Sequence, residues 1–325
     1  MSTWLAGLAL TGAVELPLNG TSAPPVPIVG GEAVSTYGWP NVVAVLSVDP
    51  KDATLGHLCS GTLIAPHIVL TAAHCLAPGT EIEEIAVYFG TSLSPHQQAT
   101  ALRYALHPDA CVEDCKPDAY DFAFIEIAED VQGVEIVPLL TTQDEWDATM
   151  AVDAAVTVVG FGAVRDDEAD DAAPLMTSER GHKREVVTVI EDFSPSGREF
   201  IAGEPGKDTC GGDSGGPVFV QLADGSWRQA GVTSRGVRPC GTGRGYYGVP
   251  FFALPWLRDE AGVDLLPAGC DDASCLDTAP PDEGCGCRSQ PTPAGSWAWL
   301  LALGLLYRRR VALRTCRKRP VRSAI

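Results

Sequence analysis

Short apolar runs separated by turn-forming residues constrain the fold of this chain more than any other feature. The sequence has 34 glycines and 25 prolines to supply turns, and no long helical periodicity interrupts the runs. This spacing is typical of an all-β sandwich or barrel. The runs are Val42–Val48, Thr62–Leu70, Ile85–Phe89, Phe122–Ile127, Ala155–Val159, Val186–Ile190, Val218–Gln221 and Val232–Ser234.

A glycine-rich segment, Asp208–Pro217, reads DTCGGDSGGP and holds Ser214 in a tight turn. A serine hydroxyl is a weak nucleophile unless a base and an orienting carboxylate lie within reach. The chain has a candidate for each of these two roles. His74 lies in the stretch LTAAHC after one apolar run, and Asp121 directly precedes another. Asp118, three residues earlier, is the nearest rival to Asp121.

Through these motifs and their order the chain resembles the trypsin and chymotrypsin family of serine peptidases. The order His, Asp, Ser differs from that of subtilisins and α/β-hydrolases. The resemblance starts at Ile28–Gly31 (IVGG), passes through His74 and Asp121 to GDSGGP, and ends near Trp256. It implies an all-β protein with two antiparallel six-stranded β-barrels and a short C-terminal helix, Phe252–Ala261.

The resemblance also assigns chemical roles. It implies that Ser214 is the nucleophile, His74 the general base and Asp121 the carboxylate that orients it. The backbone N–H groups of Gly212 and Ser214 would form the oxyanion hole. The expected activity is a serine endopeptidase that works through an acyl-enzyme intermediate.

Specificity is expected to depend on Asp208, which the resemblance puts at the base of the primary pocket. A buried carboxylate there would select Arg or Lys before the scissile bond. Ser234, Gly236 and Gly245 match the other substrate-binding positions of the family. Arg235 replaces the tryptophan that is usual between Ser234 and Gly236, and a free arginine there would favour acidic neighbours in the substrate.

Ile28 and Asp213 match the activation switch of the family, in which cleavage of a zymogen frees an α-amino group that pairs with the acid beside the nucleophile. Pro27 precedes Ile28, so an enzyme specific for Arg would not activate itself at this bond. Another protease would have to cut there, or the enzyme works without the insertion.

Eleven cysteines indicate an oxidising compartment. By resemblance, Cys59 pairs with Cys75, and Cys210 with Cys240. Cys111 and Cys115 are near enough in sequence to pair locally, with a metal site as the alternative, and the pairing of Cys270 and Cys275 stays open. We expect no cofactor and no bound metal.

The chain is expected to have terminal parts outside the protease domain. Gly284–Cys287 (GCGC), the apolar run Trp297–Tyr307 and Arg308–Arg310 follow one another in an order that resembles the C-terminal sorting tails of myxobacterial surface proteins. This implies a membrane sorting protease as a partner; a plain tail anchor is the alternative. The expected parts are a signal peptide or propeptide at 1–27, a protease domain at 28–263 with barrels at about 28–135 and 136–250, a Cys/Pro/Asp-rich linker at 264–293, and the sorting or anchor signal at 294–325.

The formal net charge of −19 argues against nucleic acid as a partner. Eight of the 23 basic residues lie between Arg308 and Arg322, which leaves 15 to balance 42 acidic residues in the rest of the chain. We expect a secreted or cell-surface monomer, anchored in a bacterial envelope, that acts on protein or peptide substrates with Arg or Lys and is open to protein inhibitors. A catalytically inactive homologue that serves as a surface binding module is the main alternative, and a serine esterase is a further one.

Overall fold

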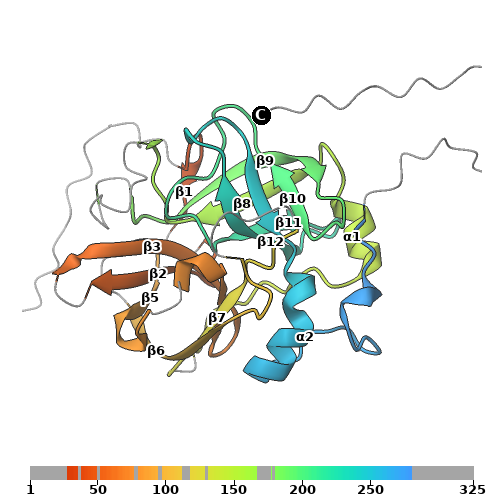
Figure 1. The fold of residues 1–325 in the computed structure, drawn as a ribbon. Helices are drawn as coiled ribbons and strands as arrows, with labels where there is room; N and C mark the ends of the chain where they lie inside the picture. Colours follow the sequence, from red (N-terminus) through yellow and green to blue (C-terminus); the bar gives the residue numbers. More distant parts are fainter. Residues whose placement is uncertain are drawn as a thin grey trace, which may run out of the picture. The chain divides into compact units, whose positions relative to one another are not determined.

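The computed structural model describes residues 28–35, 38–49, 52–76, 80–93, 97–111, 118–128, 131–166, 177 and 180–279. These residues form two closed antiparallel six-stranded β-barrels and one short C-terminal helix, which confirms the expected fold (Figure 1). Strands from the first half of the chain build one barrel and strands from the second half build the other.

The first barrel has the strand order β2-β3-β4-β7-β6-β5 and closes through pairing of β5 with β2. Branched side chains alternate inward along these strands, as a half-buried strand requires, and Val45, Leu63, Val69 and Val87 fill the interior. The strands are β2 (Val42–Asp49), β3 (Asp52–Ala65), β4 (Ile68–Thr71), β5 (Ile85–Phe89), β6 (Gln97–Leu106) and β7 (Ala123–Ile127).

The second barrel closes because β8 pairs with both β9 and β11, and the short strand β1 (Glu32–Ala33) adds to β9 at its edge. Val158, Phe200, Val218 and Tyr247 are almost completely buried in its core. The strands are β8 (Ala155–Gly160), β9 (Arg184–Phe193), β10 (Glu199–Ala202), β11 (Pro217–Gln221), β12 (Trp227–Gly236) and β13 (Gly245–Gly248).

The apolar run Thr62–Leu70 is two strands rather than one. Thr62 of β3 pairs with Leu70 of β4, and the chain reverses between them at Pro66, which has no N–H to donate to a ladder. The strands β6, β10 and β13 were not expected, because β6 turns small Ala99 and Ala101 inward and the other two are only four residues long.

Helical structure is sparse. Helix α1 (Gln143–Thr149) starts at Thr142, whose hydroxyl accepts a hydrogen bond from the Glu145 N–H, and it buries Trp146. The expected C-terminal helix is a continuous run that ends at Gly262, a glycine with φ 71°. This run comprises η4 (Pro250–Ala253), α2 (Leu254–Trp256) and η5 (Leu257–Ala261); the other short turns are η1 (Ala73–Leu76), η2 (Ile82–Glu84) and η6 (Ala273–Cys275).

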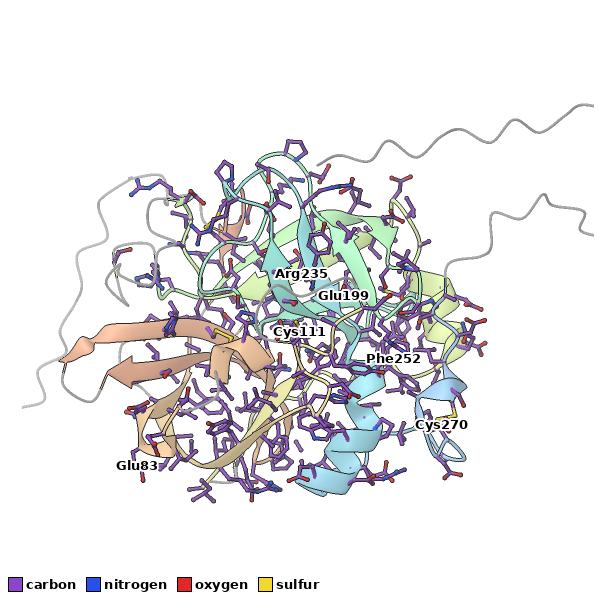
Figure 2. The ribbon with its side chains drawn as sticks, in the orientation of Figure 1. Glu83, Cys111, Glu199, Arg235, Phe252 and Cys270 are labelled. Atoms are coloured by element: carbon purple, nitrogen blue, oxygen red, sulfur yellow. A yellow bond between two sulfur atoms is a disulfide. The ribbon has the colours of Figure 1, made fainter. Side chains whose placement is uncertain are left out.

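The packed part of the chain continues past residue 263. Cys270 and Leu276 are buried in the same core cluster as the second barrel, and a disulfide joins Cys270 to Cys275 (Figure 2). The Gln143 side-chain amide donates to the Asp277 carbonyl and accepts the Asp277 backbone N–H. The first half of the expected linker is therefore folded against the barrel.

The expected cysteine motif, apolar run and basic tail lie outside the described residues, as do residues 1–27. Among the residues that the structure describes, no helix is long and apolar enough to cross a membrane.

Candidate active site

Adjacent strand ends bring His74 and Asp121 together. β4 ends at Thr71, and His74 follows in the turn η1. Asp121 stands just before β7, whose first residue, Ala123, is paired with Thr71. Since the end of β4 and the start of β7 lie at one edge of the sheet, the histidine and the aspartate face each other.

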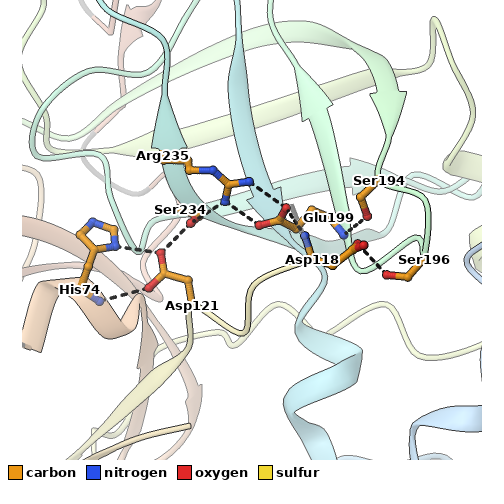
Figure 3. Close-up of polar contacts among 8 residues, drawn as sticks. All are labelled: His74, Asp118, Asp121, Ser194, Ser196, Glu199, Ser234 and Arg235. Carbon is orange, nitrogen blue, oxygen red and sulfur yellow. Dashed lines mark hydrogen bonds and ion pairs between the residues drawn. The ribbon is translucent and has the colours of Figure 1, made fainter. Parts of the chain in front are cut away.

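The Asp121 carboxylate is fully hydrogen-bonded (Figure 3). One oxygen lies 2.8 Å from the His74 ring Nδ1 and accepts the Ser234 hydroxyl at 2.6 Å, and the other accepts the His74 backbone N–H at 3.1 Å. Asp121 is 5% exposed, while His74 is 29% exposed. Burial by itself would raise the pKa of Asp121, but the hydrogen bonds and charge of His74, with the bond from Ser234, outweigh it and leave that pKa lowered.

The turn that holds Ser214 depends on its glycines. Gly212 has φ 103° and Gly215 has φ 79°, conformations that side chains rarely adopt. A Cβ on Gly215 would lie 2.1 Å from the Thr71 hydroxyl, so no other residue fits. The Gly215 N–H donates to the Thr233 carbonyl at 2.7 Å, which ties the turn to β12.

Ser60 of the first barrel also holds this turn. Its hydroxyl donates to the Gly212 carbonyl and accepts the Phe161 N–H, both at 2.9 Å, and its N–H donates to the Ser214 carbonyl at 2.7 Å. Ser60 is completely buried. The candidate nucleophile thus belongs to the second barrel in sequence but is anchored to both barrels.

The histidine turn contacts the serine turn through Cys75, the residue after His74. The Cys75 sulfur lies 3.6 Å from the Ser214 carbonyl oxygen. This sulfur is in the expected disulfide with Cys59, so it has no proton and the approach is a packing contact. The histidine turn and the serine turn therefore pack directly on each other.

A pocket of about 130 Å³ opens beside Ser214. The expected Cys210–Cys240 disulfide forms part of its wall, and Gly236 faces Thr209 across it. Ser234 and Gly245 lie outside the lining: Ser234 holds Asp121, and Gly245 packs against Tyr247. The lining residues are Thr209, Cys210, Gly211, Ser214, Thr233, Arg235, Gly236, Val237, Arg238 and Cys240.

Asp208 is buried next to the lining residue Thr209 rather than exposed in the pocket. Its carboxylate accepts the Thr209 N–H at 2.8 Å and the Gly243 N–H at 3.1 Å. No ion pair joins it to any Lys, Arg or His that the structure describes. Burial raises the pKa of Asp208, against the stabilising effect of these amides.

Asp213 is completely buried and also has only amide partners, the N–H groups of Gly162 at 2.8 Å and Cys210 at 2.9 Å. Burial raises the pKa of Asp213 to about 7. Ile28 is fully buried too, with φ 30°, a strained value for a β-branched residue. The next residue, Val29, forms an isolated β-bridge with Asp208, which brings the candidate activation segment beside the segment that leads into the serine turn.

The sequence model of the family described as Trypsin matches residues 28–257. The chain belongs to the trypsin family. Its relatives include spermosin of Halocynthia roretzi, 29% identical over 271 residues that cover 76% of this chain and 65% of that relative. Ovochymase-2 of Mus musculus is 30% identical over 233 residues, which cover 67% of this chain and 36% of that relative. The matched part of the chain thus spans less than two thirds of either relative's length.

In this trypsin-family chain, Arg235 differs from its expected role. Its guanidinium forms two hydrogen bonds, at 2.6 and 2.8 Å, with the buried carboxylate of Glu199, so its charge is compensated and the basis for a preference for acidic neighbours is lost (Figure 3). Sequence reasoning also missed Ser60 and Glu199. An acid at the start of the otherwise apolar strand EFIA is the one sequence signal for Glu199.

The remaining cysteine prediction is tested only in part. Cys111 is in a disulfide, which removes it as a metal ligand, but Cys115 lies outside the described residues (Figure 2). Ligand atoms of Cys59, His74 and Cys75 lie within 4.8 Å of one another. Because the two sulfurs are bonded to each other, they offer no thiolate to a metal.

Proposed function

We propose that this protein is a serine endopeptidase that cleaves after Arg or Lys through Ser214, His74 and Asp121. The observation that carries the proposal is the buried Asp121 carboxylate, which accepts hydrogen bonds on both oxygens and is bonded to the ring of the partly exposed His74, beside the glycine-rich serine turn. This arrangement fixes the imidazole tautomer with Nδ1 protonated and leaves Nε2 as the base.

In the proposed reaction, the Ser214 oxygen attacks the scissile carbonyl while His74 takes its proton. The N–H groups of Gly212 and Ser214 stabilise the oxyanion, a contribution of about 3–4 kcal/mol for each donor. The intermediate collapses when the C–N bond breaks and His74 gives the proton to the leaving amine. Water then hydrolyses the acyl-enzyme by the same steps, with His74 again as base.

Preference for Arg or Lys is proposed because Asp208 is a buried carboxylate beside the pocket with no cationic partner among the described residues. A substrate guanidinium or ammonium group would supply the missing charge. In the same way, the α-amino group of Ile28, freed by another protease after Pro27, would neutralise Asp213.

Hydrolysis of peptide amides ending in Arg, Lys, Phe or Ala, by protein cut to begin at Ile28, tests the proposal. Cleavage after Arg and Lys is expected, and Ser214→Ala should abolish it without loss of the folded state. A folded protein with no activity on any amide would instead indicate an inactive homologue. Cleavage of Phe but not Arg substrates would contradict the role of Asp208.

We also propose export to the cell surface, with anchoring through the C-terminal tail. The disulfides Cys59–Cys75, Cys210–Cys240 and Cys270–Cys275 support an oxidising compartment. Mass spectrometry of the mature protein tests this proposal, because an unprocessed tail that reaches Ile325 would contradict sorting.

A further inference from the structure

Glu199 is an acid in the core of the second barrel. It is the first residue of β10, directly before the buried Phe200, and is 1% exposed. Its carboxylate and the Arg235 guanidinium form a two-pronged ion pair, Oε1 to Nη1 at 2.6 Å and Oε2 to Nη2 at 2.8 Å. Such parallel bonds fix the orientation of both groups as well as their distance. We call these two side chains the Glu199–Arg235 pair.

The pair reaches across to the first barrel. The Asp118 backbone N–H donates to Glu199 Oε2 at 2.8 Å, and Asp118 lies three residues before Asp121 (Figure 3). The Asp118 carboxylate in turn accepts the Ser196 hydroxyl at 2.6 Å. The second barrel therefore holds, from two sides, the segment that leads into the candidate catalytic aspartate.

The other end of the pair meets the Asp121 carboxylate through a serine. Arg235 Nη1 lies 3.4 Å from the Ser234 hydroxyl, which donates to Asp121 at 2.6 Å. The guanidinium also lies over the Tyr246 ring, 4.4 Å from its centre, and lines the pocket beside Ser214. Arg235 is thus fixed on three sides between the substrate pocket and the triad.

Charge balance explains why both members are needed. Arg235 interacts electrostatically with Asp121, and an unpaired arginine there would compete with the His74 imidazolium for that carboxylate. Glu199 cancels the charge. The charged and titratable groups around Asp121 are His74 on η1, Asp118 on its own segment, Glu199 on β10, Arg235 on β12 and Tyr246 on β13.

We propose that Glu199 and Arg235 are positioning residues for the reaction. Together they lock the Asp118–Asp121 segment of one barrel to the Ser234–Arg235 segment of the other, and they do so without adding net charge beside the triad. This inference rests on the proposed function, because it concerns how Asp121 is held for proton transfer by His74.

The test uses protein that begins at Ile28 and the variants Arg235→Gln, Glu199→Gln and the double variant. kcat/KM for an Arg-terminated amide is measured from about pH 5 to about pH 9, together with thermal unfolding. Arg235→Gln leaves an unpaired anion, which favours protonated His74 and should move the acid limb of the profile up by about half a pH unit. Glu199→Gln leaves an unpaired cation and should move it down by a similar amount.

The double variant removes both charges, so its acid limb should return to the wild-type position. Its kcat/KM should fall by about tenfold, much less than the product of the two single losses, as expected for coupled residues. The exposed pair of Glu191 and Arg244 supplies a matched control, and Glu191→Gln should leave rate and profile unchanged.

Two results would overturn the inference. If all three variants keep the wild-type acid limb and change only the unfolding temperature, the pair is merely structural. If Glu199→Gln does not fold, Arg235→Lys takes its place in the test, because lysine keeps the positive charge but cannot form the two parallel hydrogen bonds of the guanidinium. It should then show a wild-type acid limb with reduced kcat/KM, and an unchanged kcat/KM would contradict positioning. A wild-type protein without activity contradicts the proposed function itself, which separates the two failures.

Discussion

Two regions beside Ser214 contain buried acids that differ in their hydrogen-bond donors. In the region of His74, Asp121 and Ser234, both carboxylate oxygens have side-chain or backbone donors, and one donor is a histidine that can carry charge. In the serine turn, Asp208 and Asp213 are buried as deeply but are bonded to backbone amides only.

The two regions therefore differ in whether the folded chain itself supplies a counter-charge for the buried carboxylate. Asp121 has its counter-charge, His74, within the chain, so the pKa of Asp121 is lowered and its carboxylate is ionised in the folded state. Burial raises the pKa values of Asp208 and Asp213, and for Asp213 it outweighs the opposing charge of Arg184. Under the proposed function, each of the two acids gains a cation from outside the folded domain. We infer that substrate supplies one and the freed N-terminus the other.

The largest effect is expected when the hydrogen-bonded region of His74, Asp121 and Ser234 is disrupted. Asp121→Asn keeps the shape but offers an amide where His74 needs a carboxylate, so kcat should fall by about 10⁴-fold. Thermal unfolding should change little. Asp153→Asn, at an exposed turn, is the control, and equal activity in the Asp121 variant would show that the region around Asp121 is not catalytic.

The next effect concerns the pocket acid. Asp208→Asn removes the charge that would meet a basic side chain, so kcat/KM for Arg amides should fall by about 10²–10³-fold. The same constant for Ala amides should stay within about threefold. Equal losses on both substrates would mean that Asp208 supports the turn and does not read the substrate.

We expect Asp213 to lower the stability of the uncleaved chain at neutral pH but to be needed for activity after cleavage before Ile28. In the uncleaved chain its pKa of about 7 exceeds the ordinary 3.8, so the unfolded state loses its proton first as pH rises. The contribution of Asp213 to stability should therefore be largest below about pH 4 and fall by on the order of 2–4 kcal/mol up to about pH 7. Denaturant titrations at several pH values measure this slope.

Asp213→Asn should remove that slope and stabilise the uncleaved chain at neutral pH. In protein that begins at Ile28 the same variant should instead lose activity, because the new α-amino group has no partner. A cleaved Asn variant with full activity would disprove insertion of Ile28.

The smallest predicted change tests one bond of the hydrogen-bonded region of His74, Asp121 and Ser234. Ser234→Ala removes the 2.6 Å hydrogen bond to Asp121 but leaves both bonds from His74. A loss of about 1–2 kcal/mol, or about tenfold in kcat, is expected. Ser226→Ala, at an exposed turn of the second barrel, serves as the control. Steady-state or stopped-flow assays measure kcat for both variants.

Much of the fold was predictable because short apolar runs alternate regularly, and those runs became strands β2, β5, β8 and others nearly residue for residue. Strands with small or few inward side chains, such as β6 and β10, gave no comparable pattern. The turn within the run Thr62–Leu70 was missed because it takes only two residues, Pro66 and His67, and apolar residues flank them on both sides.

The candidate site was also predictable only in part. His74 and Ser214 were indicated by local motifs, because the residues that identify each of them are adjacent in the sequence. The pairing of Glu199 with Arg235 could not be predicted from the sequence, since it depends on strands β10 and β12 lying on either side of β13. The burial of Asp208 behind Thr209 likewise follows from tertiary packing alone.

Ser60 has a consequence for engineering. Three hydrogen bonds from this one buried residue connect β3 to the Gly212–Ser214 turn and to the end of β8. A chimera that joins the first barrel of one relative to the second barrel of another would keep the candidate nucleophile of the second relative but lose the first-barrel residue that holds its serine turn. Hybrids should therefore work only when the residue after Cys59 is exchanged together with the serine turn.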